Sequence, residues 1–250
     1  MKFNIIKIVS LSLIMIFFCN YPVIAQEKIV TLATLDWEPY IGEKLENNGF
    51  ISEIVHEAFK RKGYKVKNEF LPWARVIKMA EEGKVDGYYP EYFTEELKKN
   101  YIVSESYPCG PLGFAKIKDK NISYKNMEDL KPYKIGIVRG YVNTAEFDAA
   151  TYLKKDEAVD DITNIKKLLA GRIDLIVIDK YVLSYQLKKE LPDKLNQIEF
   201  IEPPLETKEL FTCIGKKIQN GEELMKMFNE GLNEIKKDGT LKKIMQKHGF

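Results

Sequence analysis

Apolar residues follow two spacings along the chain, and these spacings predict strands and helices in turn. Short β-branched runs are typical of strands, whereas apolar positions three and four residues apart are typical of helices. The first third of the chain predicts a strand over 28–33, a helix over 52–62, a strand over 66–70, a helix over 74–82 and a strand over 85–89. Gly63 and Gly83 follow the two helices, where a terminating glycine is common. This order favours parallel βαβ units.

The same order of elements returns after residue 130. The pattern predicts a strand over 134–138, a helix from Thr144, a helix over 162–170, a strand over 173–178, a helix over 222–237 and a short helix from Thr240. The segment 173–178 is almost wholly apolar, which suits a parallel strand covered on both faces.

A short motif that occurs twice supports two units of similar structure. Gly83-Lys84-Val85-Asp86 and Gly171-Arg172-Ile173-Asp174 share a frame of glycine, basic residue, β-branched residue and aspartate. Each copy stands between a predicted helix and a predicted strand. Because the copies lie 88 positions apart, they indicate two α/β lobes.

Residues 1–25 have the composition of a secretory signal peptide. Lys2 and Lys7 precede and flank the start of an apolar run over 8–18, and Ala25 stands before Gln26 as a small residue at a cleavage position. The run is shorter than the ~20 residues that a membrane span needs. Cys19 as a lipidated residue is disfavoured by the two phenylalanines before it. The mature protein is therefore expected in the periplasm.

Charge and cysteine content exclude several classes of function. Without residues 1–25 the chain keeps 37 basic and 37 acidic residues, a balance that gives no support for a nucleic-acid partner. Cys109 and Cys213 remain, either as a disulfide or as two free thiols. His56 and His248 stand far apart, without acidic clusters. We therefore expect no metal, no cofactor and no Cys/His nucleophile.

Short motifs in a fixed order resemble those of a known family. The chain is similar to bacterial extracytoplasmic solute-binding proteins of the polar amino-acid type (family 3), the substrate-binding components of ABC transporters. The motifs are Gly49-Phe50, Gly83-Lys84-Val85-Asp86, Thr94-Glu95-Glu96, Met127-Glu128-Asp129-Leu130, Ala170-Gly171-Arg172-Ile173-Asp174 and Lys237-Asp238-Gly239-Thr240-Leu241. Together they extend from about residue 28 to residue 250.

The resemblance implies a fold and a mode of action. The fold is the α/β, two-lobed periplasmic-binding-protein (type II) fold, with lobes joined by two crossing strands near 114–118 and 210–214. Lobe 1 is expected to comprise 26–115 and 212–250, and lobe 2 to comprise 116–211. A monomer would close around a small polar ligand, an amino acid or a related molecule, and pass it to an ABC permease in the membrane.

In the first lobe, candidate ligand contacts follow the predicted strands, because the carboxyl ends of parallel strands form the crevice. Trp37 and Tyr40 follow the first strand, where family members often hold the ligand between aromatic rings; alternatively they only pack the lobe surface. Trp73 and Arg75 open a helix. The Arg75 guanidinium can hold a carboxylate through two hydrogen bonds, or it pairs with a nearby acid.

Three further candidates, Tyr89, Glu91 and Tyr92, follow the strand that begins at Val85. Strand alternation should bury some of them. Glu91 would suit an amino group or another cation on the ligand, although a solvated loop acid is an equal interpretation.

The second lobe supplies Arg139, Gly140, Tyr141 and Asp179. The first three lead into a helix whose free N–H groups can bind an anion. Asp179 falls where amino-acid-binding relatives place the acid that receives the α-amino group, but an aspartate here also caps helices. One departure stands out: the frame reads Thr94-Glu95-Glu96-Leu97, with leucine where amino-acid binders carry the arginine that grips the α-carboxylate. Arg75 or Arg139 replaces that arginine, or the ligand is not an ordinary α-amino acid.

Two other functions fit the same fold. A cyclohexadienyl-dehydratase-like enzyme would need a cleft acid with a raised pKa, and Glu91 is the one candidate. A ligand-sensing partner of a membrane receptor would act through a separate protein, because the sequence carries no output domain. The absence of a nucleophile–base pair, phosphate loop or metal motif favours a binding protein over an enzyme.

Overall fold

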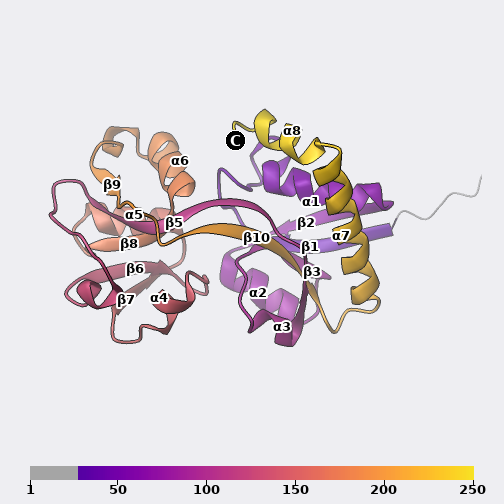
Figure 1. Ribbon diagram of the computed structural model, residues 1–250, viewed down its shortest axis with the longest axis horizontal. Coiled ribbons are helices and arrows are strands. Elements are labelled where there is room, and N and C mark those ends of the chain that lie inside the picture. Colours follow the sequence, from indigo (N-terminus) through magenta and orange to yellow (C-terminus); the bar gives the residue numbers. More distant parts are fainter. Residues whose placement is uncertain (1–27) are drawn as a thin grey trace, which may run out of the picture.

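The computed structural model describes residues 28–250, which form two lobes joined by two long strands (Figure 1). The signal peptide predicted for residues 1–25 lies outside the described residues. Within 28–250, no helix is both long enough and apolar enough to cross a membrane.

The first lobe, at the right of Figure 1, contains both ends of the described chain. Its elements are β1 (Lys28–Thr34), η1 (Glu46–Asn48), α1 (Phe50–Arg61), β2 (Tyr64–Phe70), α2 (Trp73–Glu81), β3 (Gly87–Glu91), α3 (Leu97–Asn100), β4 (Tyr101–Val103), α7 (Gly221–Lys237) and α8 (Thr240–Lys247). Strand β1 pairs in parallel with β2 on one side and β3 on the other. This is the βαβαβ order that the sequence predicts.

Helices α1 and α7 pack closely in this lobe because a glycine stands at their contact. A Cβ atom on Gly231 would lie 2.0 Å from the backbone oxygen of Ala58, so a larger residue there would push the helices apart. Phe59 and Phe228 contact each other beside this point, with ring centroids 4.9 Å apart. Helix α7, from the C-terminal part of the chain, thereby completes the core of the lobe that also contains β1.

The second lobe has the same layered build. Its elements are η2 (Met127–Leu130), β6 (Lys134–Val138), α4 (Ala145–Ala149), β7 (Lys154–Ala158), α5 (Asp161–Leu169), β8 (Leu175–Asp179), α6 (Lys180–Glu190), η3 (Pro192–Lys194) and β9 (Ile198–Phe200). Strand β6 pairs in parallel with both β7 and β8. Every residue of β8 is buried, as the apolar segment 173–178 predicts.

Two strands, β5 (Tyr107–Ile117) and β10 (Glu206–Gly215), run between the lobes (Figure 1). They pair with each other in antiparallel fashion. Beyond this pairing β10 continues onto β3 and β4 in the first lobe, and β5 continues onto β8 and β9 in the second. The predicted lobe boundaries at 115/116 and 211/212 fall inside these strands, and they stay a prediction.

Candidate functional site

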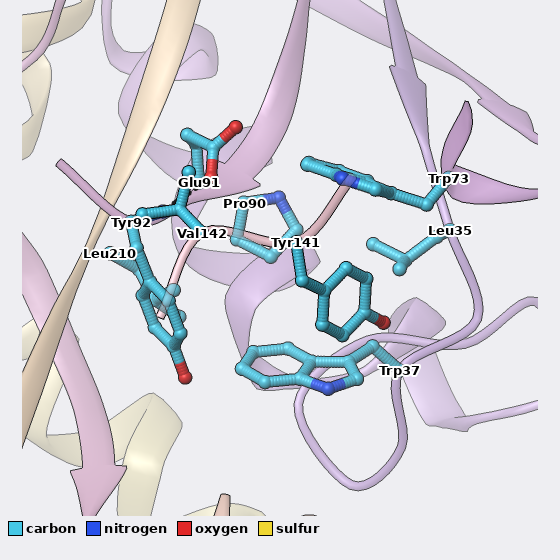
Figure 2. A pocket seen from close by; sticks show the side chains of 9 residues that line it. All are labelled: Leu35, Trp37, Trp73, Pro90, Glu91, Tyr92, Tyr141, Val142 and Leu210. Carbon is cyan, nitrogen blue, oxygen red and sulfur yellow. Dashed lines mark hydrogen bonds between the residues drawn. The ribbon is translucent and has the colours of Figure 1, made fainter. Parts of the chain in front are cut away.

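A small cavity lies where the two lobes meet (Figure 2). The space in it that is open to water molecules is about 30 Å³, which is enough for water. The residues that line it are Leu35, Trp37, Trp73, Pro90, Glu91, Tyr92, Tyr141, Val142 and Leu210. An amino-acid-sized molecule needs more room, so its entry requires the lobes to separate or the side chains to move.

The cavity forms where strands end, as expected for a sheet of parallel strands. Leu35 and Trp37 follow β1, and Glu91 is the last residue of β3. Trp73 begins α2, while Tyr141 follows β6 in the second lobe. The walls of the cavity therefore come from both lobes.

Aromatic rings form most of the walls. Figure 2 shows the Tyr141 ring between Trp37 and Trp73. Its centroid lies 5.9 Å from that of Trp73, in an edge-to-face arrangement, and Trp37 meets Tyr92 edge to face at 6.0 Å. Such rings present electron-rich faces that attract cations as well as apolar groups.

Glu91 carries the carboxyl group of the wall, and it is only 5% exposed. One oxygen accepts a hydrogen bond from the Tyr92 backbone N–H at 2.8 Å, and the other accepts one from the Tyr88 hydroxyl at 3.1 Å. Burial raises the pKa of the Glu91 carboxyl to about 8, against the opposing effects of these two hydrogen bonds and the Lys208 charge. The interpretation of Glu91 as a solvated loop acid is therefore wrong.

Three polar contacts hold the lobes together around the cavity. The Tyr40 hydroxyl lies 3.0 Å from both carboxylate oxygens of Asp179. Trp73 Nε1 donates to the backbone oxygen of Gly140 at 2.9 Å. At the rim, Lys189 on α6 pairs with Glu38 at 3.0 Å. The described structure is a closed arrangement of the lobes.

Asp179 also caps helix α6. Its Oδ1 accepts hydrogen bonds from the backbone N–H groups of Tyr181 and Val182, at 2.8 and 3.1 Å. The side chain is buried, and burial raises its pKa to about 6. The capping role proposed from the sequence is thus observed, and a ligand role for Asp179 stays a prediction.

Asp161 belongs to the same region, although the sequence did not single it out. It is 8% exposed at the start of α5. Burial, together with the charges of Asp179 and Asp160, raises its pKa to about 7, while hydrogen bonds from Trp37 and Tyr141 act in the opposite direction. The sequence signal for this residue was the pair Asp160-Asp161 at the start of a helix. Acidic residues are common there as helix caps, so the pair did not indicate a site residue.

The structure gathers some predicted residues and separates others. Trp37, Trp73, Glu91, Tyr92 and Tyr141 line the cavity, whereas Leu35, Pro90, Val142 and Leu210 were not predicted. Tyr40, Gly140 and Asp179 lie at the adjoining lobe contact. Tyr89 points into the first lobe, where its hydroxyl bonds Ser52 and Asn68.

The two predicted arginines lie away from the cavity. Arg75 is exposed on α2. Arg139 pairs with Glu157 at 2.7 Å, and its side chain is 63% exposed. None of the residues that line the cavity is lysine, arginine or histidine. The replacement of the missing carboxylate-binding arginine by either residue stays a prediction.

Two remaining questions of chemistry concern thiols and metals. Cys109 and Cys213 are both free thiols. Cys109 lies 3.7 Å from the Tyr92 hydroxyl and 3.9 Å from Asp179, and burial raises its pKa, which disfavours the reactive thiolate. In the part of the chain that the structure describes, no three His, Cys, Asp or Glu side chains are arranged to hold a metal ion.

Comparison with known families decides what kind of protein carries this site. The model of the bacterial extracellular solute-binding proteins, family 3, matches residues 29–250. The chain belongs to this family. Membership confirms the resemblance read from the short motifs, and it favours a binding protein over an enzyme on the same fold.

Individual relatives agree with this assignment. The probable amino-acid-binding protein YxeM of Bacillus subtilis strain 168 is 27% identical over 205 residues, which cover 80% of this chain and 75% of YxeM. The L-cystine-binding protein TcyJ of Escherichia coli strain K12 is 26% identical over 217 residues, which cover 82% of this chain and 76% of TcyJ. This family 3 chain is thus similar to proteins named for binding solutes.

A solved structure confirms the fold. An ancestral arginine-binding protein bound to arginine is 26% identical and superposes with a TM-score of 0.74, over 89% of this chain and 98% of that chain. The two-lobed α/β fold predicted from the sequence is therefore correct.

Proposed function

We propose that this family 3 protein captures a small polar solute between its lobes outside the cytoplasmic membrane. The cavity at the lobe junction is the observation that carries the proposal. It is built from the ends of strands in both lobes, so a ligand bound there contacts both lobes and favours the closed arrangement. An amino acid or a related molecule is the class supported by the names of the similar proteins.

Within this function we assign two roles to the site residues. Trp37, Trp73, Glu91, Tyr92 and Tyr141 contact the ligand, because they line the cavity. Tyr40, Gly140 and Asp179 act at the lobe contact beside it. Asp179 exchanges its Tyr40 hydrogen bonds for ligand contacts if it receives an amino group.

Export and delivery complete the proposal. Cleavage of residues 1–25 releases the mature protein into the periplasm, as their composition indicates. The monomer then passes its solute to an ABC permease in the membrane. Family membership and the presence of two lobes within one chain support this sequence of events.

A thermal-shift screen tests whether the protein captures small solutes. Purified protein is heated with amino acids, amines and small organic acids in separate wells. A ligand that binds only the folded state stabilises it by about 2.7 kcal/mol at a hundredfold excess over its Kd. We expect at least one clear upward shift in melting temperature, and a variant with Trp73→Ala should lose it. A screen in which no small solute shifts the melting temperature would contradict the proposed function.

A further inference from the structure

The cavity and its surroundings hold two buried carboxyl groups, and no basic side chain lines the wall. Glu91 lines the cavity, and Asp161 lies beside it in contact with Trp37 and Tyr141. Both carboxyls are more than nine-tenths buried. None of the residues that line the cavity carries a basic side chain.

The nearby basic residues form ion pairs with acids outside the cavity, although the Lys208 charge still favours the ionised form of Glu91. Lys208 lies 5.0 Å from the centre of the Tyr92 ring, but its ammonium pairs with Glu206 at 3.0 Å. Arg139 pairs with Glu157 and faces solvent. Leu97 follows Thr94-Glu95-Glu96, so this segment supplies no arginine.

These charges decide which ligand groups the closed site accepts. A ligand carboxylate would lose its hydration beside Glu91 and find no cation on the wall, which makes its burial costly. An ammonium group that reached the Glu91 carboxyl as the side chains moved would find acceptor capacity to spare, because Glu91 accepts only two hydrogen bonds within the protein. The faces of Trp37, Trp73 and Tyr141 would add cation–π attraction.

We propose that the solute recognised in this cavity is an organic cation that carries an ammonium or guanidinium group and no carboxylate. The proposal rests on the binding function proposed above and narrows its ligand class. Glu91 receives the cationic group, and the aromatic rings enclose its apolar part. Burial raises the pKa of Glu91 and of Asp161, with the Lys208 charge acting against it at Glu91, and a bound cation would stabilise the ionised form of each carboxyl.

Matched pairs of solutes test the proposal by titration calorimetry. Agmatine is compared with arginine, putrescine with ornithine, and choline with glycine betaine, because the members of each pair share a cationic group and differ in the carboxylate. We expect the member without carboxylate to bind at least about tenfold more tightly in the pair that fits best. Equal or tighter binding of the carboxylate-bearing member would overturn the proposal.

Two other outcomes separate this proposal from the binding function itself. If none of the six solutes binds while another molecule shifts the melting temperature, the cation proposal fails and the binding function stands. If no small solute of any class binds, both fail.

A pair of glutamate variants shows whether the cavity carboxylate makes the contact. Glu91→Gln keeps the size of the side chain and removes its charge, so we expect the affinity for the best cation to fall at least about tenfold. Glu209→Gln is the matched control, because Glu209 is exposed on β10 beside the lining residue Leu210; its affinity should stay within about twofold. Equal losses in the two variants, or no loss in Glu91→Gln, would overturn the assignment.

Discussion

Replacing Asp179 with alanine is expected to lower the free energy of unfolding at pH 5 by about 3 kcal/mol. The loss has two parts. The substitution removes the cap of α6, worth about 1 kcal/mol. It also leaves the Tyr40 hydroxyl, on a side chain that is 1% exposed, without its acceptor, at a cost of about 1–3 kcal/mol.

The pH of this measurement matters because the pKa of Asp179 is raised to about 6. A carboxyl with a raised pKa contributes its full stability below its unfolded pKa and loses part of it as the pH rises through 6. Alanine removes that charge penalty, so the difference between the proteins should narrow above pH 7. Urea unfolding at pH 5 and pH 8 gives both values.

Asp179→Asn separates the structural role of this residue from its role in binding. Asparagine caps helices as well as aspartate does, so stability at pH 5 should stay within about 1 kcal/mol of the original. The affinity for a cationic solute should fall about tenfold, because a negative charge beside the cavity is lost. Asp119→Ala, at an exposed position, is the control and should change neither quantity. If the affinity is unchanged in Asp179→Asn, Asp179 only caps α6 and contacts the first lobe, and it has no role in binding.

Glu91→Gln is expected to be more stable than the original protein at pH 9 and similar to it at pH 5. The pKa of Glu91 rises from 4.5 to about 8 on folding. The stability contributed by its neutral form is therefore complete below pH 4.5 and is lost as the pH rises towards 8. Glutamine stays neutral throughout. We expect a gain of about 3 kcal/mol at pH 9, an order-of-magnitude value for one buried carboxylate.

The groups that face Glu91 determine the size of this effect. Tyr88 and the Tyr92 N–H donate to it, and the Lys208 charge favours its ionised form. The Cys213 thiol also lies within electrostatic range, and burial keeps its pKa well above normal; Tyr101 and Tyr141 have raised pKa values too. These three stay neutral between pH 5 and pH 9. Asp161 and Asp179 titrate in this range in both proteins, so the difference between the variant and the original protein belongs to Glu91.

Urea unfolding at pH 5 and pH 9 measures this difference, with Glu209→Gln as the exposed control. The control should match the original protein at both values. A difference between Glu91→Gln and the original protein that does not change with pH would mean that Glu91 ionises normally.

Strong periodic patterns explain why much of the fold could be predicted. The strand 134–138 and the long C-terminal helix were expected within one residue of their observed bounds. Strand β7 was missed because it is an edge strand with the sequence Lys-Lys-Asp-Glu-Ala and a single buried residue. Its place in the sheet depends on pairing with β6, which no local pattern reveals. The bounds of α6 were missed because only three of its residues are buried.

The site was predictable only in outline, since the ends of parallel strands indicate which loops form it. Trp37 and Glu91 were expected on that basis and line the cavity. The direction of each side chain is set by packing between the lobes. Tyr89 therefore points into the first lobe, Arg75 points to solvent, and Asp161 was overlooked.

Closure around a solute is the central claim, and small-angle X-ray scattering with and without the tightest ligand tests it most directly. In solution the free protein should sample separated lobes, because the cavity of the closed arrangement holds only about 30 Å³ and a solute must enter. Saturating ligand should reduce the radius of gyration towards that of the closed structure. Scattering curves that coincide with and without a ligand shown by calorimetry to be bound would contradict the account.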